Sequence, residues 1–215
     1  NKYQSLIQKH YKRLLNTIKS DVLGKVKGYT KEAENVSQKG FISLEIDIEK
    51  FLKVFLSYAK EDLYDLSFDT IESMLKDLNL DGSDIANDYD KVLNSSMKES
   101  ADKIKLSLET LDKTIRDVVK DTIDGANPDL TNAELRKLIK EQLNLEFDSI
   151  SANRSETIAK TTANTGTNST KDGVIEKNKL YKQWLHSRGA SEKPRPHHQQ
   201  AEGTVADKNG YFNIG

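Results

Sequence analysis

Three of the four histidines lie close together in the last part of the chain, at His186, His197 and His198, with Glu192 and Glu202 nearby. A zinc site needs about four nitrogen, sulfur or oxygen ligands, and imidazole and carboxylate both qualify. A metal-dependent nuclease or toxin domain that uses His197 and His198 is therefore one hypothesis. Adjacent histidines on a helix or strand point in different directions, however, so both cannot easily bind one ion. We favour a polar turn and predict no metal and no cofactor.

No other pattern in the sequence indicates catalysis. The sequence contains no Gly-rich phosphate loop, no nucleophile elbow and no His-Glu-x-x-His zinc motif. The carboxylates of Asp81, Asp84 and Asp88 near Gly82 resemble a calcium loop only loosely, because the register of the ligands fails. Cysteine is absent, which excludes disulfides and Cys-based zinc sites. We therefore predict that the protein is not an enzyme.

Basic and aromatic side chains are interleaved in the C-terminal region, at Lys177, Lys179, Tyr181, Lys182 and Trp184. Such a mixture is typical of surfaces that contact phosphates and stack on bases. Formal charge is +4 over residues 151–215 and −5 over the remainder, although chance alone can produce this asymmetry in a chain that is 31% charged. We predict that the three lysines contact DNA weakly and without sequence preference, or contact an acidic partner, and that the two aromatic residues fill a small core.

Apolar residues recur with helical spacing along the first 127 residues, which contain no proline. The spacing predicts a helix from Tyr3 to Val26 and a second from Ile48 to Leu63, with Ser43 as a candidate cap. A short third helix is expected from Phe68 to Leu78, and a long fourth from Ile85 to Ile123. No run of 18 apolar residues occurs, so we expect no membrane-spanning helix.

The clearest break in this pattern is the segment 125–128, which contains both Gly and Pro. Beyond it, Thr131 and Glu134 have the spacing of a capping box, in which each side chain satisfies the backbone N–H of the other residue. We expect one helix to follow this cap and another to begin near Asn144. The β-branched and small polar residues of 161–170 are poor helix formers, so this stretch, taken alone, predicts a loop that becomes helical only if neighbours hold it.

Strand-like patterning is confined to the last part of the chain. Alternation from Lys179 to Ser187, anchored by Trp184, and the apolar segment 211–214 predict two strands. The predicted fold class is therefore mainly α, with a long-helix region at 1–124 and a small α/β domain at 125–215. Because the second strand falls at the very end of the sequence, we expect that the chain continues and that this domain is truncated.

An ordered string of short elements fills the second half of the chain: the Asp124-Gly125 break, the cap at Thr131, the segment Arg154 to Thr161, Trp184-Leu185, the turn Arg195 to His198, Glu202-Gly203, and Phe212 to Gly215. In order and spacing, over about 100 residues, this string resembles the Mu F-like family of phage minor head proteins, also called head-morphogenesis proteins. Two positions depart from the family pattern, since Lys160 replaces the usual Arg and Thr162 the usual Glu. The first 110 residues show no such resemblance.

The resemblance implies a structural protein of a tailed-phage virion, associated with the portal or inner capsid protein and acting in head assembly or DNA delivery. Such a protein would assemble in the host cytoplasm, in an oligomeric state imposed by the virion. The resemblance also implies framework or interaction roles for Arg154, Trp184, Arg195, His198 and Gly203, with the two arginines tying helix and turn together through carboxylates or carbonyls. A helical adaptor unrelated to phages stays open as a further alternative.

Overall fold

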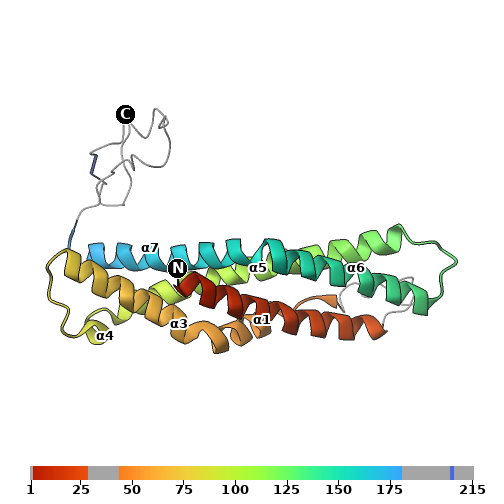
Figure 1. Ribbon diagram of the computed structural model, residues 1–215, viewed down its shortest axis with the longest axis horizontal. Coiled ribbons are helices and arrows are strands. Elements are labelled where there is room, and N and C mark those ends of the chain that lie inside the picture. The colour runs from red at the N-terminus through yellow and green to blue at the C-terminus, as the bar shows by residue number, and fades with distance from the viewer. Residues whose placement is uncertain (1, 29–43, 181–203, 206–215) are drawn as a thin grey trace. The chain divides into compact units, whose positions relative to one another are not determined.

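The computed structural model describes residues 2–28, 44–180 and 204–205, and its fold is mainly α-helical (Figure 1). No strand occurs within 2–28 or 44–180, in agreement with the predicted helical character. The predicted strand segments beyond Leu180 lie outside the described residues. Within the described part of the chain, no helix is both long enough and apolar enough to cross a membrane.

The described helices are α1 (Lys2–Lys25), the 3-10 turn η1 (Val26–Gly28), α3 (Ile48–Asp77), α4 (Ile85–Asp88), α5 (Asp90–Asp124), α6 (Asn132–Asn153) and α7 (Ser155–Lys177). Helix α3 packs against α5. Helix α1 packs on α3 and α6, and α6 also packs on α5. These four helices therefore enclose a common interior. Figure 1 shows that α3 and α5 run side by side in opposite directions.

The chain divides into two compact units, residues 1–170 and residues 171–215. The domain boundary expected after Asp124 falls inside the first unit, because α6 packs on helices that precede this boundary. The segment 154–162, expected to pack with Trp184 in a C-terminal domain, also belongs to the first unit. Trp184 itself lies outside the described residues.

Large apolar side chains fill the interior between α1, α3, α5 and α6. The fully buried ones include Ile7, Leu14, Ile18, Phe51, Phe55, Leu63, Ile104, Leu108, Ile139 and Leu143. They recur every three or four residues, so each helix turns one apolar stripe inward. Burying each such side chain contributes roughly 1.5–3 kcal/mol of transfer free energy, which makes this interior the main source of stability for the unit.

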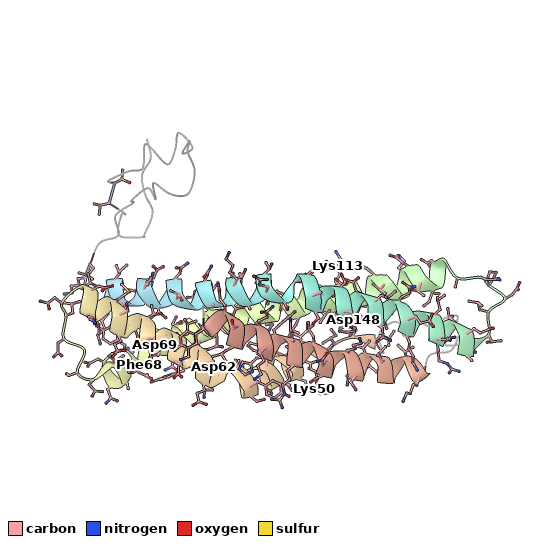
Figure 2. The ribbon with its side chains drawn as sticks, viewed as in Figure 1. Lys50, Asp62, Phe68, Asp69, Lys113 and Asp148 are labelled. Atoms are coloured by element: carbon pink, nitrogen blue, oxygen red, sulfur yellow. The ribbon has the colours of Figure 1, made fainter. Side chains whose placement is uncertain are left out.

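Polar contacts along α1 fix how it lies on its neighbours. The His10 ring Nε2 is 2.6 Å from a carboxylate oxygen of Asp62, and the Tyr3 hydroxyl donates a hydrogen bond to Asp69. Both carboxylates belong to α3, where Figure 2 labels them, whereas Lys19 donates to Asp148 of α6 over 2.8 Å. These pairs add little free energy each at a partly exposed site, but they select one register of α1.

Three predicted helix boundaries are wrong, the first being the single helix expected from Ile85 to Ile123, which is divided at Tyr89 into α4 and α5. α3 is one helix where two were expected, and α6 continues through Asn144 without a break. In α3 the inward stripe passes through Ser67, a polar residue that is 1% exposed and that the apolar pattern skips. The start of α3 is capped by Asp47, whose side chain accepts from the Lys50 N–H, whereas the predicted cap Ser43 lies outside the described residues.

The capping box at the start of α6 is confirmed. The Thr131 hydroxyl oxygen accepts from the Glu134 N–H over 3.3 Å, and the Glu134 carboxylate accepts from the Thr131 N–H over 2.8 Å. Because both partners lie within four residues of each other, the sequence alone contains the whole interaction.

Residues 161–170 are helical, so the loop that their composition predicts in isolation does not form. A buried hydroxyl seam, comprising Ser67, Ser96, Ser100, Thr162, Gly166 and Thr170, joins this segment to α3 and α5. The Ser96 hydroxyl donates to the Gly166 carbonyl over 2.8 Å, and Thr170 donates to the same carbonyl over 2.8 Å. Polar contacts with neighbouring helices thus stabilise this helical segment, whose own residues have a low helix propensity.

The seam also includes a close approach of neighbouring side chains to Gly166. A Cβ atom placed on Gly166 would lie 2.6 Å from the Ser100 Oγ and 3.5 Å from a methyl carbon of Leu66. The first distance is far below van der Waals contact. Any larger residue at this position would therefore require the Ser100 side chain to move.

Candidate functional site at the junction of α6 and α7

The structure describes three of the residues that the sequence singled out: Arg154, Lys177 and Lys179. Those outside the described residues are Lys182, Trp184, Arg195, His197, His198 and Gly203. The nuclease hypothesis rests on His197 and His198 and so lies outside the described residues as well. In the part of the chain that is described, no group of His, Asp and Glu side chains is arranged to hold a metal ion.

Lys177 and Lys179 lie at the exposed C-terminal end of α7. Lys179 has a positive φ of 52°, and the Leu180 N–H closes the helix end by donating to the Ile175 carbonyl over 2.8 Å. This is the left-handed ending that glycine usually occupies, so Lys179 carries conformational strain. Arg154 directly precedes Ser155, the first residue of α7, and belongs to the first compact unit, whereas these lysines belong to the second.

Arg154 marks the junction between α6 and α7. Its N–H donates to the Ile150 carbonyl, and its own carbonyl accepts from the Ile158 N–H, each over 2.9 Å, so helical hydrogen bonding continues across the junction. The side chain is exposed, and its guanidinium makes no ion pair within residues 2–28 and 44–180. Its neighbours one turn away, Ile150, Ser151, Thr157 and Ile158, are all uncharged.

A partly enclosed cavity of about 260 Å³ opens beside Arg154. Four helical segments line it: Tyr11 of α1, three residues of α5, Ile150 of α6, and the first turn of α7. Its apolar wall consists of Leu111, Ile150 and Ile158, and its polar groups come from Tyr11, Ser107, Thr110, Arg154 and Thr157. Arg154 is the only charged residue among them. The cavity therefore combines an apolar wall with a single cation.

The Tyr11 hydroxyl is part of this polar group. Burial raises the pKa of the Tyr11 hydroxyl above its ordinary value, although a hydrogen bond with Ser107 and the positive charge of Arg154 act in the opposite direction. Both of these groups line the cavity, so the hydroxyl lies at the cavity even though the residue is only 1% exposed. A phenol with a raised pKa keeps its proton and remains a hydrogen-bond donor near neutral pH.

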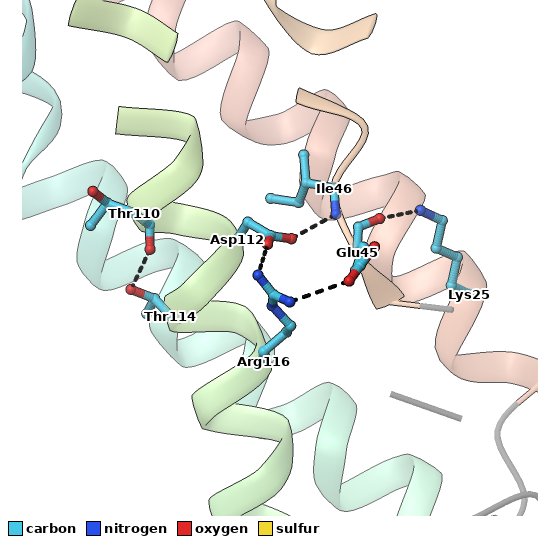
Figure 3. A network of polar contacts seen from close by, with 7 residues as sticks. All are labelled: Lys25, Glu45, Ile46, Thr110, Asp112, Thr114 and Arg116. Atoms are coloured by element: carbon cyan, nitrogen blue, oxygen red, sulfur yellow. Dashed lines mark hydrogen bonds and ion pairs between the residues drawn. The ribbon is translucent and has the colours of Figure 1, made fainter. Parts of the chain in front are cut away.

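A second polar cluster, which we call the Asp112 clasp, lies at the start of α3 (Figure 3). Asp112 of α5 is 5% exposed; one of its oxygens accepts from the Ile46 N–H over 2.8 Å, and the other pairs with Arg116 over 2.5 Å. Arg116 also reaches a Glu45 side-chain oxygen at 3.2 Å. Every charged group in the clasp has a partner, which indicates a structural fastening for the segment before α3.

Sequence reasoning missed the cavity and the clasp for related reasons. The Asp112 and Ile46 contact joins positions 66 residues apart, and the cavity collects side chains from four helices. The one local signal is an acidic residue set between the apolar positions Leu111 and Ile115 of α5. A charge that falls on a buried stripe predicts a partner, but the pattern does not identify it.

Comparisons with known proteins give no assignment. No family model matches the chain, and neither curated proteins nor solved structures contain a match.

Proposed function

We propose that this chain is a structural and interaction module of a tailed-phage head, a minor head protein that contacts the portal or the inner capsid. The observation that carries the proposal is the construction of the helical unit. Its longest helix, α5, has 35 residues, or about 50 Å at 1.5 Å per residue, and packs on both α3 and α6. A long helix braced in this way is suited to holding a binding surface at a fixed distance from its support.

The resemblance of residues 110–215 to the Mu F-like family supports the finer part of the proposal. It implies a small α/β domain within 125–215, and it implies that the protein belongs to the virion after assembly in the host cytoplasm. In this proposal the helical unit docks on portal or capsid, and Arg154, Trp184 and Arg195 serve as framework or interaction residues.

Quantitative mass spectrometry of purified proheads and mature heads, from the phage that encodes this chain, tests the proposal. We expect the chain in both particles at a low copy number relative to the major capsid protein. Purified chain and purified portal should also comigrate in size-exclusion chromatography. Absence from both particles, together with independent migration, would contradict the proposal.

The proposed contact with DNA is tested on the whole chain by fluorescence anisotropy at low and moderate salt. Double substitution of Lys177→Glu and Lys179→Glu should weaken binding, and binding should fall steeply as salt rises because phosphate contacts release counterions. The matched control is Lys113→Glu with Lys120→Glu, two exposed lysines of α5. Equal loss in both double variants would show that only total charge matters.

A further inference from the structure

We propose that the cavity at the α6–α7 junction binds a small amphipathic carboxylate, whose charged end pairs with Arg154 and whose apolar body lies against Leu111, Ile150 and Ile158. This inference concerns the helical unit alone and is independent of the role in a phage head.

The charge of the site favours an anion. Among the described residues that line the cavity, Arg154 alone is charged, and none is a carboxylate. Its helical neighbours at three and four residues' distance are uncharged, so no pairing along the helix neutralises it. The guanidinium also makes no ion pair elsewhere within the described residues. A planar guanidinium fork binds a carboxylate through two parallel hydrogen bonds, which favours this anion over a halide.

The hydroxyl groups around the cavity sort into donors and acceptors. Ser107 already donates to the Ile104 carbonyl over 2.7 Å, and Thr110 donates to the Leu106 carbonyl over 3.0 Å. Their oxygens can therefore only accept further bonds. The Tyr11 hydroxyl hydrogen-bonds Ser107, whose own proton is used by the Ile104 carbonyl, so the Tyr11 proton is also used. The donors that the described lining residues leave to a ligand are thus the Arg154 guanidinium and the Thr157 hydroxyl, which suit the two oxygens of a carboxylate.

The volume of the cavity limits the size of the ligand's apolar part. An apolar cavity of about 150 Å³ accommodates benzene, so about 260 Å³ leaves room for one ring, or a chain of similar volume, together with a carboxylate. An inorganic anion would leave the apolar wall in contact with water, and a neutral hydrocarbon would leave Arg154 without a partner. An aryl- or alkyl-carboxylate uses both features.

Isothermal titration of the whole chain with 3-phenylpropionate, and with the neutral analogue 3-phenylpropanol, tests the proposal. We expect a dissociation constant on the order of 0.1 mM for the carboxylate, typical of so small a ligand. The alcohol should bind at least about tenfold more weakly, because it lacks the charge-assisted hydrogen bonds. Equal affinity for both ligands, or no saturable binding of the carboxylate at about 1 mM, would overturn the proposal.

Two variants locate the binding. Arg154→Met removes the charge but keeps a side chain of similar length. Because Arg154 is exposed and makes no ion pair within the described residues, the fold should be retained. We expect about a tenfold or greater loss of affinity for 3-phenylpropionate. Lys160→Met removes an equivalent charge from an exposed position on α7 that does not line the cavity, and should bind like the unmodified chain. Equal losses in both variants would mean non-specific charge attraction. Inorganic phosphate that competes as well as the carboxylate would indicate a general anion site and would also overturn the proposal.

Discussion

Where α1 lies against α3 and α6, the interior consists of large apolar side chains such as Phe55 and Ile139, whereas the interior that α5 shares with residues 155–170 is lined by hydroxyl groups. The first interior gains stability from buried apolar area and accepts approximate fits. The second gains little from area and depends on specific hydrogen bonds and on one close approach at Gly166. The comparison shows that one helical unit can combine an apolar core that tolerates substitutions of similar volume with a polar core that depends on specific contacts.

The largest expected effect belongs to the apolar interior. Phe55 is fully buried, so Phe55→Ala should lower the free energy of unfolding by about 3–5 kcal/mol through lost transfer energy and the cavity left behind. Urea denaturation followed by circular dichroism measures it. Leu145→Ala, at a position that is 65% exposed, is the control and should change stability by less than about 0.5 kcal/mol. If Phe55→Ala changed the free energy of unfolding as little as the control does, the distinction between the two interiors would be lost.

Gly166→Ala tests the close approach in the seam. In an ordinary helix this change stabilises by about 1 kcal/mol, because alanine is the better helix former. At Gly166 the new Cβ would lie 2.6 Å from the Ser100 Oγ, so we expect destabilisation of about 1–3 kcal/mol instead. Gly24→Ala in α1 is the matched control, since nothing lies within 4 Å of its added Cβ, and it should stabilise. Thermal melting of both variants should give shifts of opposite sign, and a stabilised Gly166 variant would contradict a tight seam.

Two threonines of the seam allow its hydrogen bonds to be tested without a change of shape. The Thr162 hydroxyl is buried and has no hydrogen-bond partner among the described residues, so Thr162→Val should be neutral or stabilise by up to about 1 kcal/mol. The Thr170 hydroxyl donates to the Gly166 carbonyl and lies 2.8 Å from the Ser96 Oγ, so Thr170→Val should destabilise by about 1 kcal/mol or more. Chemical denaturation of the pair compares them directly. If both variants lose equal stability, the bonds of Thr170 contribute nothing specific.

The smallest effect comes from a surface charge that belongs to neither interior. Partial burial acts to raise the pKa of Asp21, but hydrogen bonds and positive charge from Lys25 and Lys50 outweigh it and hold the pKa below its ordinary value. A lowered pKa in the folded state contributes stability above the unfolded value of about 3.9, and this contribution is lost as pH falls through the folded value. Asp21→Asn should therefore cost less than about 1 kcal/mol near neutral pH and nothing at the acid end. Denaturation curves from pH 7 down to about pH 2 measure the difference, and a cost that persists in acid would exclude the ion pairs as its cause.

The sequence predicted those features whose partners are close along the chain. The stripe of α1 and the capping box at Thr131 are complete within one or two turns, so periodicity and spacing were sufficient. The continuity of α3 was missed because Ser67 reads as an exposed residue until Ser96, 29 positions away, becomes its partner. The helix over 161–170 was missed for the same reason, since its support comes from α3 and α5 rather than from its own propensity.

The candidate site divides in a similar way. Arg154 was singled out by resemblance alone, and the structure places it beside a cavity that no sequence pattern contains. The other lining residues are apolar positions of the helix stripes and common hydroxyl residues, which do not indicate a cavity until α1, α5 and α6 converge on one place. Spatial convergence of this kind is a property of the fold, so single-sequence reasoning cannot supply it.

The Asp112 clasp has a practical consequence for labelling the protein. Lys25, near the end of α1, donates to the Glu45 carbonyl over 2.8 Å, and Asp112 holds the next residue, Ile46, so the end of α1 and the residues before α3 are held together directly. Extra length in the chain between Lys25 and Glu45 should cost little free energy, because loop-closure entropy grows slowly with length. We expect a peptide tag or fluorescent reporter inserted there to leave the stability of the helical unit nearly unchanged.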